Sequence, residues 1–348
     1  MNEAPRGLTR KQLLLGIAFA AVSLGALYIV LPNIAGLGDT WRRLDRGEPG
    51  WLTAGLFLEI ASFFCYVALF RGIIGHEAGI GWAQSYRITL ASLAATRLLA
   101  AGGIGGIALT AWALRRDGLS ASLVALRMAT MLVLLYAVYM GAVLLAGLGL
   151  RIGILSGPSP LGFTLIPAAV AGLIIVAALL IGYFGGELGE TTKRLSHPNR
   201  RERWRAALDT VPNTLAGGVR GAIAIVRERP INGLWAIGWW GFDIAVLWAC
   251  LHAFGTPPPV GVIVASYFVG MTANLLPLPG GVGGVEGGLI GSLIAFGVPG
   301  GLAIVAVLSY RAFSFWLPTI PGAIAYISIL RHEPAAAAAA GEGQAEAA

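Results

Sequence analysis

The sequence predicts an all-α polytopic membrane protein containing an inverted repeat with two re-entrant helical hairpins. Of its 348 residues 57% are hydrophobic and only 12% are charged, and the mean hydropathy is +0.77. A soluble domain carries about a quarter charged residues, so a soluble globule of this size could not cover its surface. Two cysteines, Cys65 and Cys250, are too few for a disulfide scaffold. Two glycine-rich breaks at matching places in apolar regions predict the hairpins and the repeat.

The apolar regions define the membrane domain, because a crossing of the bilayer core needs about 20 residues. The first region, Gln12–Leu31, follows Arg10 and Lys11, and a cleaved signal peptide is the alternative interpretation. The other regions are Trp51–Ile74, Trp82–Leu114, Leu119–Leu150, Gly162–Phe184, Ile231–Phe254, Val260–Phe296 and Gly301–Leu330. The predicted organisation is an N-terminus (1–11), a transmembrane domain (12–330) with repeat halves at about 51–150 and 231–330, and a disordered Ala-rich tail (331–348).

Two of these regions are interrupted. The first break contains Gly102, Gly103, Gly105 and Gly106, and the second contains Pro277, Pro279, Gly280, Gly281, Gly283 and Gly284. Glycine and proline weaken or end helices, so each region is expected to enter the membrane and return to its own side. The alternative interpretation is close helix packing through small residues.

The two interrupted regions align as copies of one unit. Residues 95–106 match residues 273–284, and Gly118-Leu119-Ser120 matches Gly297-Val298-Pro299. In the preceding spans Glu59 matches Asp243, and in the following spans Arg127 is paired with Arg311. One extra span between the units makes them inverted, a design typical of transporters with a binding site near the membrane midplane.

The 24 Lys and Arg residues predict the orientation. With two hairpins and a cytoplasmic N-terminus, 16 of them face the cytoplasm, four face outward and four lie in apolar regions. This predicts a multi-pass protein of the cytoplasmic membrane with both termini inside. The basic segment 185–230 is expected to form an amphipathic helix on the anionic leaflet. Nucleic-acid binding is the alternative for that segment, and its tethering at both ends argues against it.

Charged residues also occur inside apolar regions, where each costs at least about 2.5 kcal/mol. They are Glu59, Arg87, Arg97, Arg127, Asp243, Glu286 and Arg311. One interpretation is a polar cavity for a lipid headgroup, with the phosphate bound by Arg97, Arg127, Arg311, Asn274 and Glu286 and by the positive helix starts at 103–108 and 281–286. The other is structural ion pairing, for example of Arg127 or Arg311 with Glu59 or Asp243.

Glu286 has three interpretations: a cap of the returning helix, a contact for a cationic headgroup, or a proton carrier. The four histidines have no partner at metal-ligand spacing, and no catalytic triad or nucleotide-binding motif is present. We therefore expect no metal, no cofactor and no catalytic residue.

The motif Asn274–Glu286, then Phe296-Gly297-Val298-Pro299, then Tyr310-Arg311, resembles the signature of the lysylphosphatidylglycerol synthase transmembrane region, a family of flippase-like membrane proteins. The resemblance covers about residues 12–330 and implies the membrane part alone, without an aminoacyl-transferase domain. Where the family often has Pro-Gly and an acidic residue, this chain has Ala101-Gly102 and Ala108, so the resemblance supports a binding role more for the second hairpin than for the first.

Together these observations predict a lipid flippase that is not an enzyme and moves a phospholipid or a polyprenyl-phosphate-linked lipid between leaflets. Transport would be independent of energy or coupled to an ion. A membrane-embedded enzyme with Glu59 and Asp243 as acid and base is one alternative. A partner subunit for a separate glycosyltransferase or aminoacyltransferase is the other. Membrane lipids are the expected partners, and the oligomeric state stays open.

Overall fold

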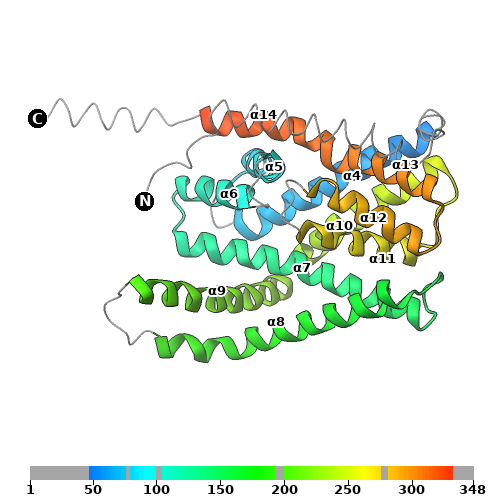
Figure 1. Ribbon diagram of the computed structural model, residues 1–348. Coiled ribbons are helices and arrows are strands. Elements are labelled where there is room, and N and C mark those ends of the chain that lie inside the picture. The colour runs from blue at the N-terminus through cyan, green and yellow to red at the C-terminus, as the bar shows by residue number, and fades with distance from the viewer. Residues whose placement is uncertain (1–46, 76–78, 99–103, 193–199, 276–280, 332–348) are drawn as a thin grey trace, which may run out of the picture.

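The computed structural model describes residues 47–75, 79–98, 104–192, 200–275 and 281–331, and every regular element in these ranges is helical (Figure 1). The first half contains α4 (Pro49–Phe70) with a π-helical turn (Arg71–Gly75), α5 (Trp82–Leu98), α6 (Ile104–Arg116) and α7 (Ala121–Arg151). A 3-10 turn (Leu161–Phe163), α8 (Leu165–Thr192) and α9 (Arg200–Glu228) follow. The second half contains α10 (Ile231–Phe254), α11 (Val260–Met271) with a 3-10 turn (Thr272–Leu275), α12 (Gly284–Ala295), α13 (Gly300–Arg311), a second π-helical turn (Ala312–Trp316) and α14 (Leu317–Arg331). The described ranges exclude the predicted first span (12–31), the N-terminus (1–11), the tail beyond 331, and the break residues Gly102, Gly103, Pro277, Pro279 and Gly280.

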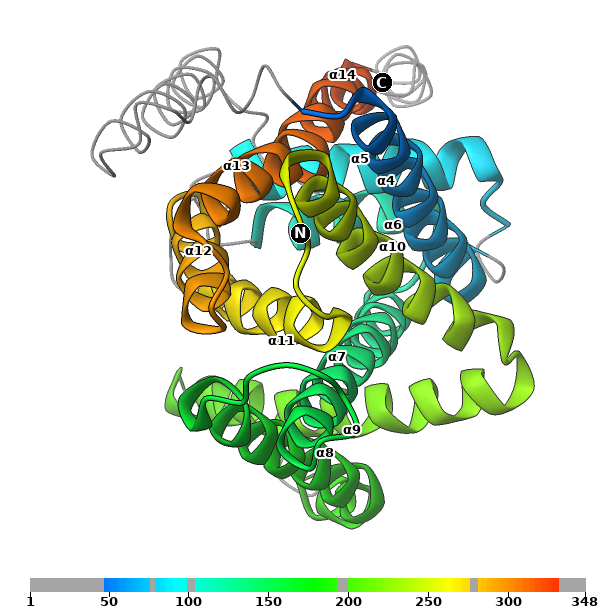
Figure 2. The same ribbon diagram turned by 90° about the vertical axis from the view of Figure 1, so that its right-hand side faces the viewer.

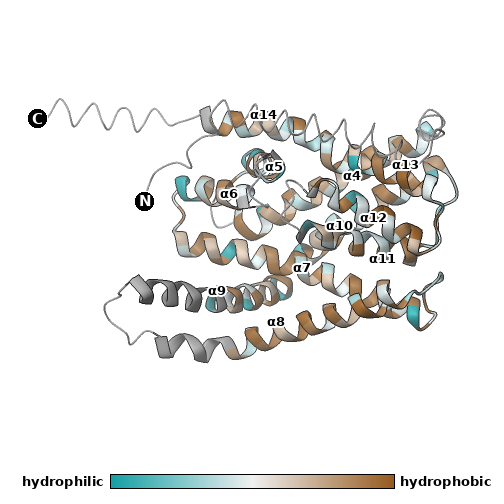
Figure 3. Ribbon diagram, viewed as in Figure 1, coloured by the Kyte–Doolittle hydropathy of each residue, from teal (hydrophilic) through white to brown (hydrophobic). Residues whose placement is uncertain are grey.

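Within the described residues five helices are long and apolar enough to cross a membrane, and they confirm that the protein is a multi-pass helical membrane protein (Figure 3). They are Pro49–Gly75, Ala121–Arg151, Leu161–Phe184, Ile231–Phe254 and Gly300–Ile329. These bounds agree with five predicted spans to within a few residues. The last of them differs from an ordinary helix, because the π-helical turn divides it into α13 and α14.

The second interrupted region folds as two short antiparallel helices. Helices α11 and α12 have 12 residues each, about 18 Å of helix, which is well short of a bilayer core of about 30 Å. Ser292 Oγ donates a hydrogen bond to the Ser266 carbonyl at 3.0 Å. One turn nearer the break, Gly288 packs so closely on Gly270 that a Cβ at Gly288 would lie 2.9 Å from the Gly270 carbonyl oxygen.

The first interrupted region has the same form. The hydroxyl oxygens of Ser92 on α5 and Thr110 on α6 lie 2.7 Å apart. One turn nearer the break, a Cβ at Gly106 would lie 2.4 Å from the Ser92 carbonyl and 2.1 Å from the Thr96 hydroxyl. Only glycine fits here, so it fixes the close approach of α5 and α6.

Helices α4 and α10 form the most extensive helix pair and run antiparallel. At one end the Glu48 amide donates to the Ala253 carbonyl at 2.9 Å. Further along, Ser62 Oγ donates to the Trp239 carbonyl at 2.9 Å, 177 residues away in the chain. The pair therefore joins the first span of one half to the first span of the other.

Each half also packs its last span on the hairpin of the other half. Helix α14 lies against α5, where a Cβ at Gly322 would lie 2.7 Å from the Leu90 carbonyl. Helix α7 lies against α11, and the Tyr139 hydroxyl donates to the Phe268 carbonyl at 2.5 Å. The halves are interlocked, and Figure 2 shows the crossing of α4 with α10 beside the α11–α13 group.

Helix α9 occupies the basic segment for which an amphipathic helix was predicted, and with α7 and α8 it forms one side of the molecule (Figures 1 and 2). Its described side chains, from residue 213 onward, pack into the bundle: Gly218 lies against Ala129 of α7, and Val219 lies against Gly182 of α8. This part of α9 is a packed helix, not one that lies alone on a leaflet. The side chains of its basic part, 200–212, are outside the described residues.

Among the described residues two large buried apolar clusters hold the bundle together, one around each hairpin, and a smaller third cluster contains Ala146, Val262 and Phe296. One of the two large clusters contains Leu247, Phe268 and Leu289 and the other contains Ile88, Leu114 and Ala236. Helix α10 contributes to both large clusters. The acidic residue near its middle, Asp243, therefore lies at their junction, between Ala236 and Leu247 in the chain.

Candidate functional site

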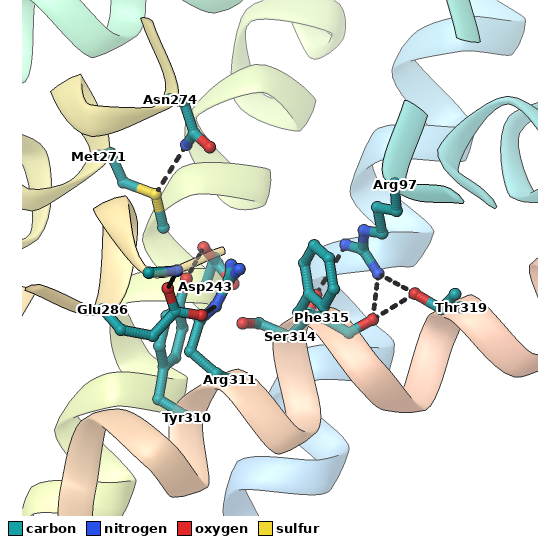
Figure 4. A network of polar contacts seen from close by, with 11 residues as sticks. Arg97, Asp243, Met271, Asn274, Glu286, Tyr310, Arg311, Ser314, Phe315 and Thr319 are labelled. Carbon is teal, nitrogen blue, oxygen red and sulfur yellow. Dashed lines mark hydrogen bonds and ion pairs between the residues drawn. The ribbon is translucent and has the colours of Figure 1, made fainter. Parts of the chain in front are cut away.

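A buried ion pair joins the second hairpin to the last span (Figure 4). Arg311 Nε donates to Glu286 Oε1 at 2.7 Å, and the two residues are 5% and 1% exposed. The other oxygen of Glu286, Oε2, accepts the Gly283 backbone N–H at 2.7 Å. Glu286 therefore caps the first turn of α12, which is one of its predicted roles, and at the same time binds the arginine. The cap works because free N–H groups at a helix start favour a carboxylate.

Asp243 of α10 is held by two tyrosines. Its Oδ2 accepts the Tyr310 hydroxyl at 2.8 Å and also the Tyr267 hydroxyl. The donors come from α13 and α11, and both tyrosines are buried. Neither was predicted as a site residue. Two features of the sequence could have pointed to them. Tyr310 precedes Arg311 in the motif, and Tyr267 is a polar ring in an otherwise apolar segment.

Arg97, at the end of α5, binds the π-helical turn that separates α13 from α14. Its guanidinium donates to the carbonyls of Ser314 at 2.8 Å and Phe315 at 2.5 Å, and to the Thr319 hydroxyl at 3.1 Å. A π-helical turn shifts backbone carbonyls off the regular α-helical hydrogen-bond ladder. The arginine satisfies these carbonyls and ties the first hairpin to the last span.

Phe315 lies between the two arginines (Figure 4). The guanidinium carbons of Arg97 and Arg311 are 4.7 and 4.2 Å from its ring centroid. Such cation–π contacts contribute about 2 kcal/mol or more each when the cation is shielded from water. The phenyl ring thus links two like charges that would otherwise repel one another. No sequence motif pointed to this residue.

Glu59 of α4 completes the cluster. It is 8% exposed, and Asp243 and Arg97 are the charged groups that act on it. Its Oε2 is buried and has no hydrogen-bond partner among the described residues. Five charged side chains from five helices thus converge, drawn from both halves: Glu59, Arg97, Asp243, Glu286 and Arg311.

Three other candidates lie elsewhere. Arg127 is half-buried on α7 and is the seventh residue of its helix, whereas Arg311 is the twelfth of α13, so the two do not share a position. Arg87 is exposed and donates to Ser328 Oγ at 3.0 Å. Asn274 is exposed in the 3-10 turn, where its Oδ1 lies beside Gly281 and its Nδ2 is 3.4 Å from Met271 Sδ.

The cluster has the donors and acceptors for a charged headgroup, because guanidinium groups bind phosphate oxygens with several parallel hydrogen bonds. In this conformation carbonyls and Glu286 engage both arginines, so a phosphate would have to exchange with those partners. Among the described residues the structure shows an ion pair of Arg311 with Glu286, whereas the structural interpretation paired Arg127 or Arg311 with Glu59 or Asp243. The described residues contain no group of three or more His, Cys, Asp or Glu that could hold a metal ion.

Comparison with known proteins identifies the family. A sequence profile described as the lysylphosphatidylglycerol synthase TM region matches residues 13–322. The chain belongs to this family. The resemblance seen in the Asn274–Glu286 motif is thereby confirmed for nearly the whole transmembrane domain.

Curated relatives within the same family are named UPF0104 membrane proteins and come from Methanothermobacter thermautotrophicus. One is 34% identical over 116 residues, which are 33% of this chain and 33% of the relative. A second is 28% identical over 124 residues, covering 34% of this chain and 37% of the relative. The matches thus span about a third of the length of these relatives.

Proposed function

We propose that this protein moves a lipid with a phosphate-containing headgroup, a phospholipid or a polyprenyl-phosphate-linked lipid, between the leaflets of the cytoplasmic membrane. The observation that carries the proposal is the cluster of five charged side chains between two helical hairpins, of which Glu59, Glu286 and Arg311 are buried and Arg97 and Asp243 are partly buried. Charges inside a membrane protein are costly and mark substrate or ion pathways. The family description, which names a lipid, supports the choice of substrate class.

The contacts within the two hairpins support an inverted repeat. The alignment of residues 95–106 with 273–284 shifts the chain by 178 positions. The same shift carries Ser92 onto Gly270 and Thr110 onto Gly288, and in each hairpin these two residues contact one another. Helices α4 and α10, the equivalent first spans, run antiparallel, as they must if the two halves are inverted in the membrane.

The ends of the hairpins support the same equivalence. Gly118 follows α6 with φ +96° and Gly297 follows α12 with φ +89°. After each glycine the next amide reaches back to the helix: Leu119 N–H to the Leu114 carbonyl at 3.2 Å, and Val298 N–H to the Leu293 carbonyl at 3.0 Å. This is the Schellman ending, in which glycine takes the left-handed conformation.

Short antiparallel helices suit a re-entrant hairpin, which enters the membrane and leaves on its own side. With two such hairpins the distribution of Lys and Arg supports a cytoplasmic location for both termini. The headgroup would pass the buried cluster while the acyl or prenyl tail stays in the hydrocarbon. Exposed Asn274 at the second break would meet it first, and Arg97 and Arg311 would exchange their present partners for the phosphate. No covalent bond changes, so the protein would act as a transporter and not as an enzyme.

Reconstitution tests the proposal. The purified protein is placed in vesicles containing a trace of fluorescent phosphatidylglycerol, and a membrane-impermeant quencher is added outside. Without translocation about half of the label is quenched, because half faces outward. We expect the wild type to raise this fraction and Arg311→Ala to return it to the protein-free value, because the main phosphate ligand is lost.

Two controls make the result specific. Arg115→Ala removes an exposed arginine at the end of α6 and should leave translocation unchanged. If Arg311→Ala does not fold, Glu286→Gln replaces it as the test variant, because this change keeps the size of the side chain. A wild type at the protein-free value with phosphatidylglycerol and with a polyprenyl-phosphate probe would contradict the proposal.

A membrane-embedded enzyme is the second candidate, because the carboxyl groups of Glu59 and Asp243 lie close enough to interact electrostatically. Lipid extracts of a deletion strain discriminate between the two. An unchanged lipid inventory with an altered leaflet distribution supports translocation, and a missing lipid species supports the enzyme. In either case a separate glycosyltransferase or aminoacyltransferase is a candidate partner that supplies the lipid.

A further inference from the structure

Among the described residues, the charges of this cluster do not balance. Two arginines, Arg97 and Arg311, face three carboxyl groups, Glu59, Asp243 and Glu286. Glu286 and Arg311 neutralise each other in a direct ion pair at 2.7 Å. This leaves one arginine against two carboxyl groups, so full ionisation would bury a net negative charge between the hairpins. An unbalanced charge in such a site is strongly disfavoured.

The geometry distinguishes the two remaining carboxyl groups. Asp243 accepts hydrogen bonds from two tyrosine hydroxyls, which stabilise a carboxylate. Glu59 is over nine-tenths buried, and its Oε2 has no hydrogen-bond partner among the described residues. Arg97 does not form an ion pair with either group, because its described hydrogen bonds go to two backbone carbonyls and a threonine hydroxyl.

We infer that Glu59, facing Asp243, is a proton-binding site and that the cluster is neutral when Glu59 carries the proton. The groups that face it are Asp243 from α10 and Arg97 from α5. Asp243 in turn interacts with Tyr267 from α11 and with Tyr310 and Arg311 from α13. The proton is taken up by the Glu59 carboxylate and released from the same oxygen, with no other bond formed or broken.

The site gives the proposed transport a coupling ion, and in this respect the inference rests on the proposed function. With the proton bound, the neutral cluster can accept a phosphate group at the arginines. Without it, the net negative charge repels the phosphate. An anionic headgroup and a proton therefore bind together, and a proton gradient would bias the direction of lipid movement.

Infrared spectroscopy tests proton binding without any lipid assay. The carbonyl stretch of a protonated carboxylic acid is followed during a pH titration of the reconstituted full-length protein. We expect the wild type to have a band that titrates above the pH range of exposed carboxyl groups, which lies at about pH 4, and we expect Glu59→Gln to lack this band. Glu48→Gln, which changes an exposed glutamate next to the start of the same helix, should keep the band.

The alternatives give different results. A band that persists in Glu59→Gln, or a wild type without one, overturns the inference; Glu59→Asp replaces Glu59→Gln if that variant does not fold. A midpoint that moves when sodium chloride replaces choline chloride also overturns it, in favour of a sodium site.

The transport assay then separates this inference from the proposed function. In vesicles with a pH difference across the membrane, the wild type should move fluorescent phosphatidylglycerol faster in the direction of proton flow, and Glu59→Gln should lose that dependence. Lipid movement without a titrating carboxyl group would support the proposed lipid translocation and overturn the inference that Glu59 binds a proton. A titrating carboxyl group without lipid movement would do the reverse.

Discussion

The two hairpins share a backbone design and differ in chemistry. A contact between the two helices occurs at equivalent positions, Ser92 with Thr110 in the first and Gly270 with Gly288 in the second, and both hairpins end in a left-handed glycine. Only the second hairpin has an acidic residue at its returning helix. Glu286 binds Arg311 there, whereas the equivalent position in the first is the exposed Ala108. The two hairpins therefore share features of backbone packing, whereas the ion pair of Glu286 with Arg311 belongs to the second hairpin.

The largest effect is expected where the hairpins differ most. Glu286→Ala should destabilise the protein by about 3–5 kcal/mol, because it leaves the buried Arg311 without its partner and α12 without its cap. The double variant Glu286→Ala/Arg311→Ala should lose clearly less than the two single variants together. Unfolding by a denaturant in detergent micelles, followed by circular dichroism, measures both effects.

The equivalent change in the first hairpin is the control. Ala108→Ser should unfold at nearly the same denaturant concentration as the wild type, since Ala108 is exposed. If Glu286→Ala were as stable as Ala108→Ser, the ion pair would contribute nothing to the stability of the folded protein. The chemical difference between the hairpins would then have no effect on stability.

The next effect concerns the glycine contact of the second hairpin. In Gly270→Ala the added Cβ would lie 2.8 Å from the Leu289 Cα, a backbone atom that cannot move without shifting α12. Overpacking of this kind costs about 1–3 kcal/mol. Gly291→Ala, where nothing lies within 4 Å, should be neutral or stabilising in the same unfolding experiment. Equal stabilities of the two variants would show that the hairpin does not depend on this contact.

A similar loss in both halves is expected at the helix endings. Gly118→Ala and Gly297→Ala each force a Cβ into the left-handed region, at a cost of about 1–2 kcal/mol. Because both endings have the same hydrogen bonds, the two losses should agree closely when unfolding is measured. Gly241→Ala, within α10 and with no atom near the added Cβ, is the control. A clear difference between Gly118→Ala and Gly297→Ala would contradict the equivalence of the two endings.

Much of the fold could be predicted from the sequence, because membrane spans are defined by long apolar runs and by their ends. The bounds predicted for Ile231–Phe254 agree with α10 at both ends. The glycine breaks also separate α5 from α6 and α11 from α12. The π-helical turn Ala312–Trp316 was not predicted, since it lies inside a continuous apolar run and leaves no signal in hydropathy.

The site was only partly predictable. Charges inside apolar regions pointed to Glu59, Arg97, Asp243, Glu286 and Arg311, which the structure brings together. Their partners depend on helix packing and could not be inferred. Arg97 reaches a turn 217 residues later in the chain, and the expected equivalence of Arg127 and Arg311 fails because helix register, not residue type, sets which way a side chain points.

The smallest effect tests the polar contact of the first hairpin. Ser92→Ala removes the hydrogen bond to Thr110 across the same position at which the second hairpin has glycine on glycine. One hydrogen bond of this kind contributes about 0.5–1.5 kcal/mol, so the unfolding transition should move slightly to lower denaturant. Thr110→Ser keeps the hydroxyl and should restore most of the stability that Thr110→Ala loses. If Ser92→Ala matched the wild type, the hairpin would be held by helix packing alone, and the polar contact would be a remnant of the repeat and not a part of its stability.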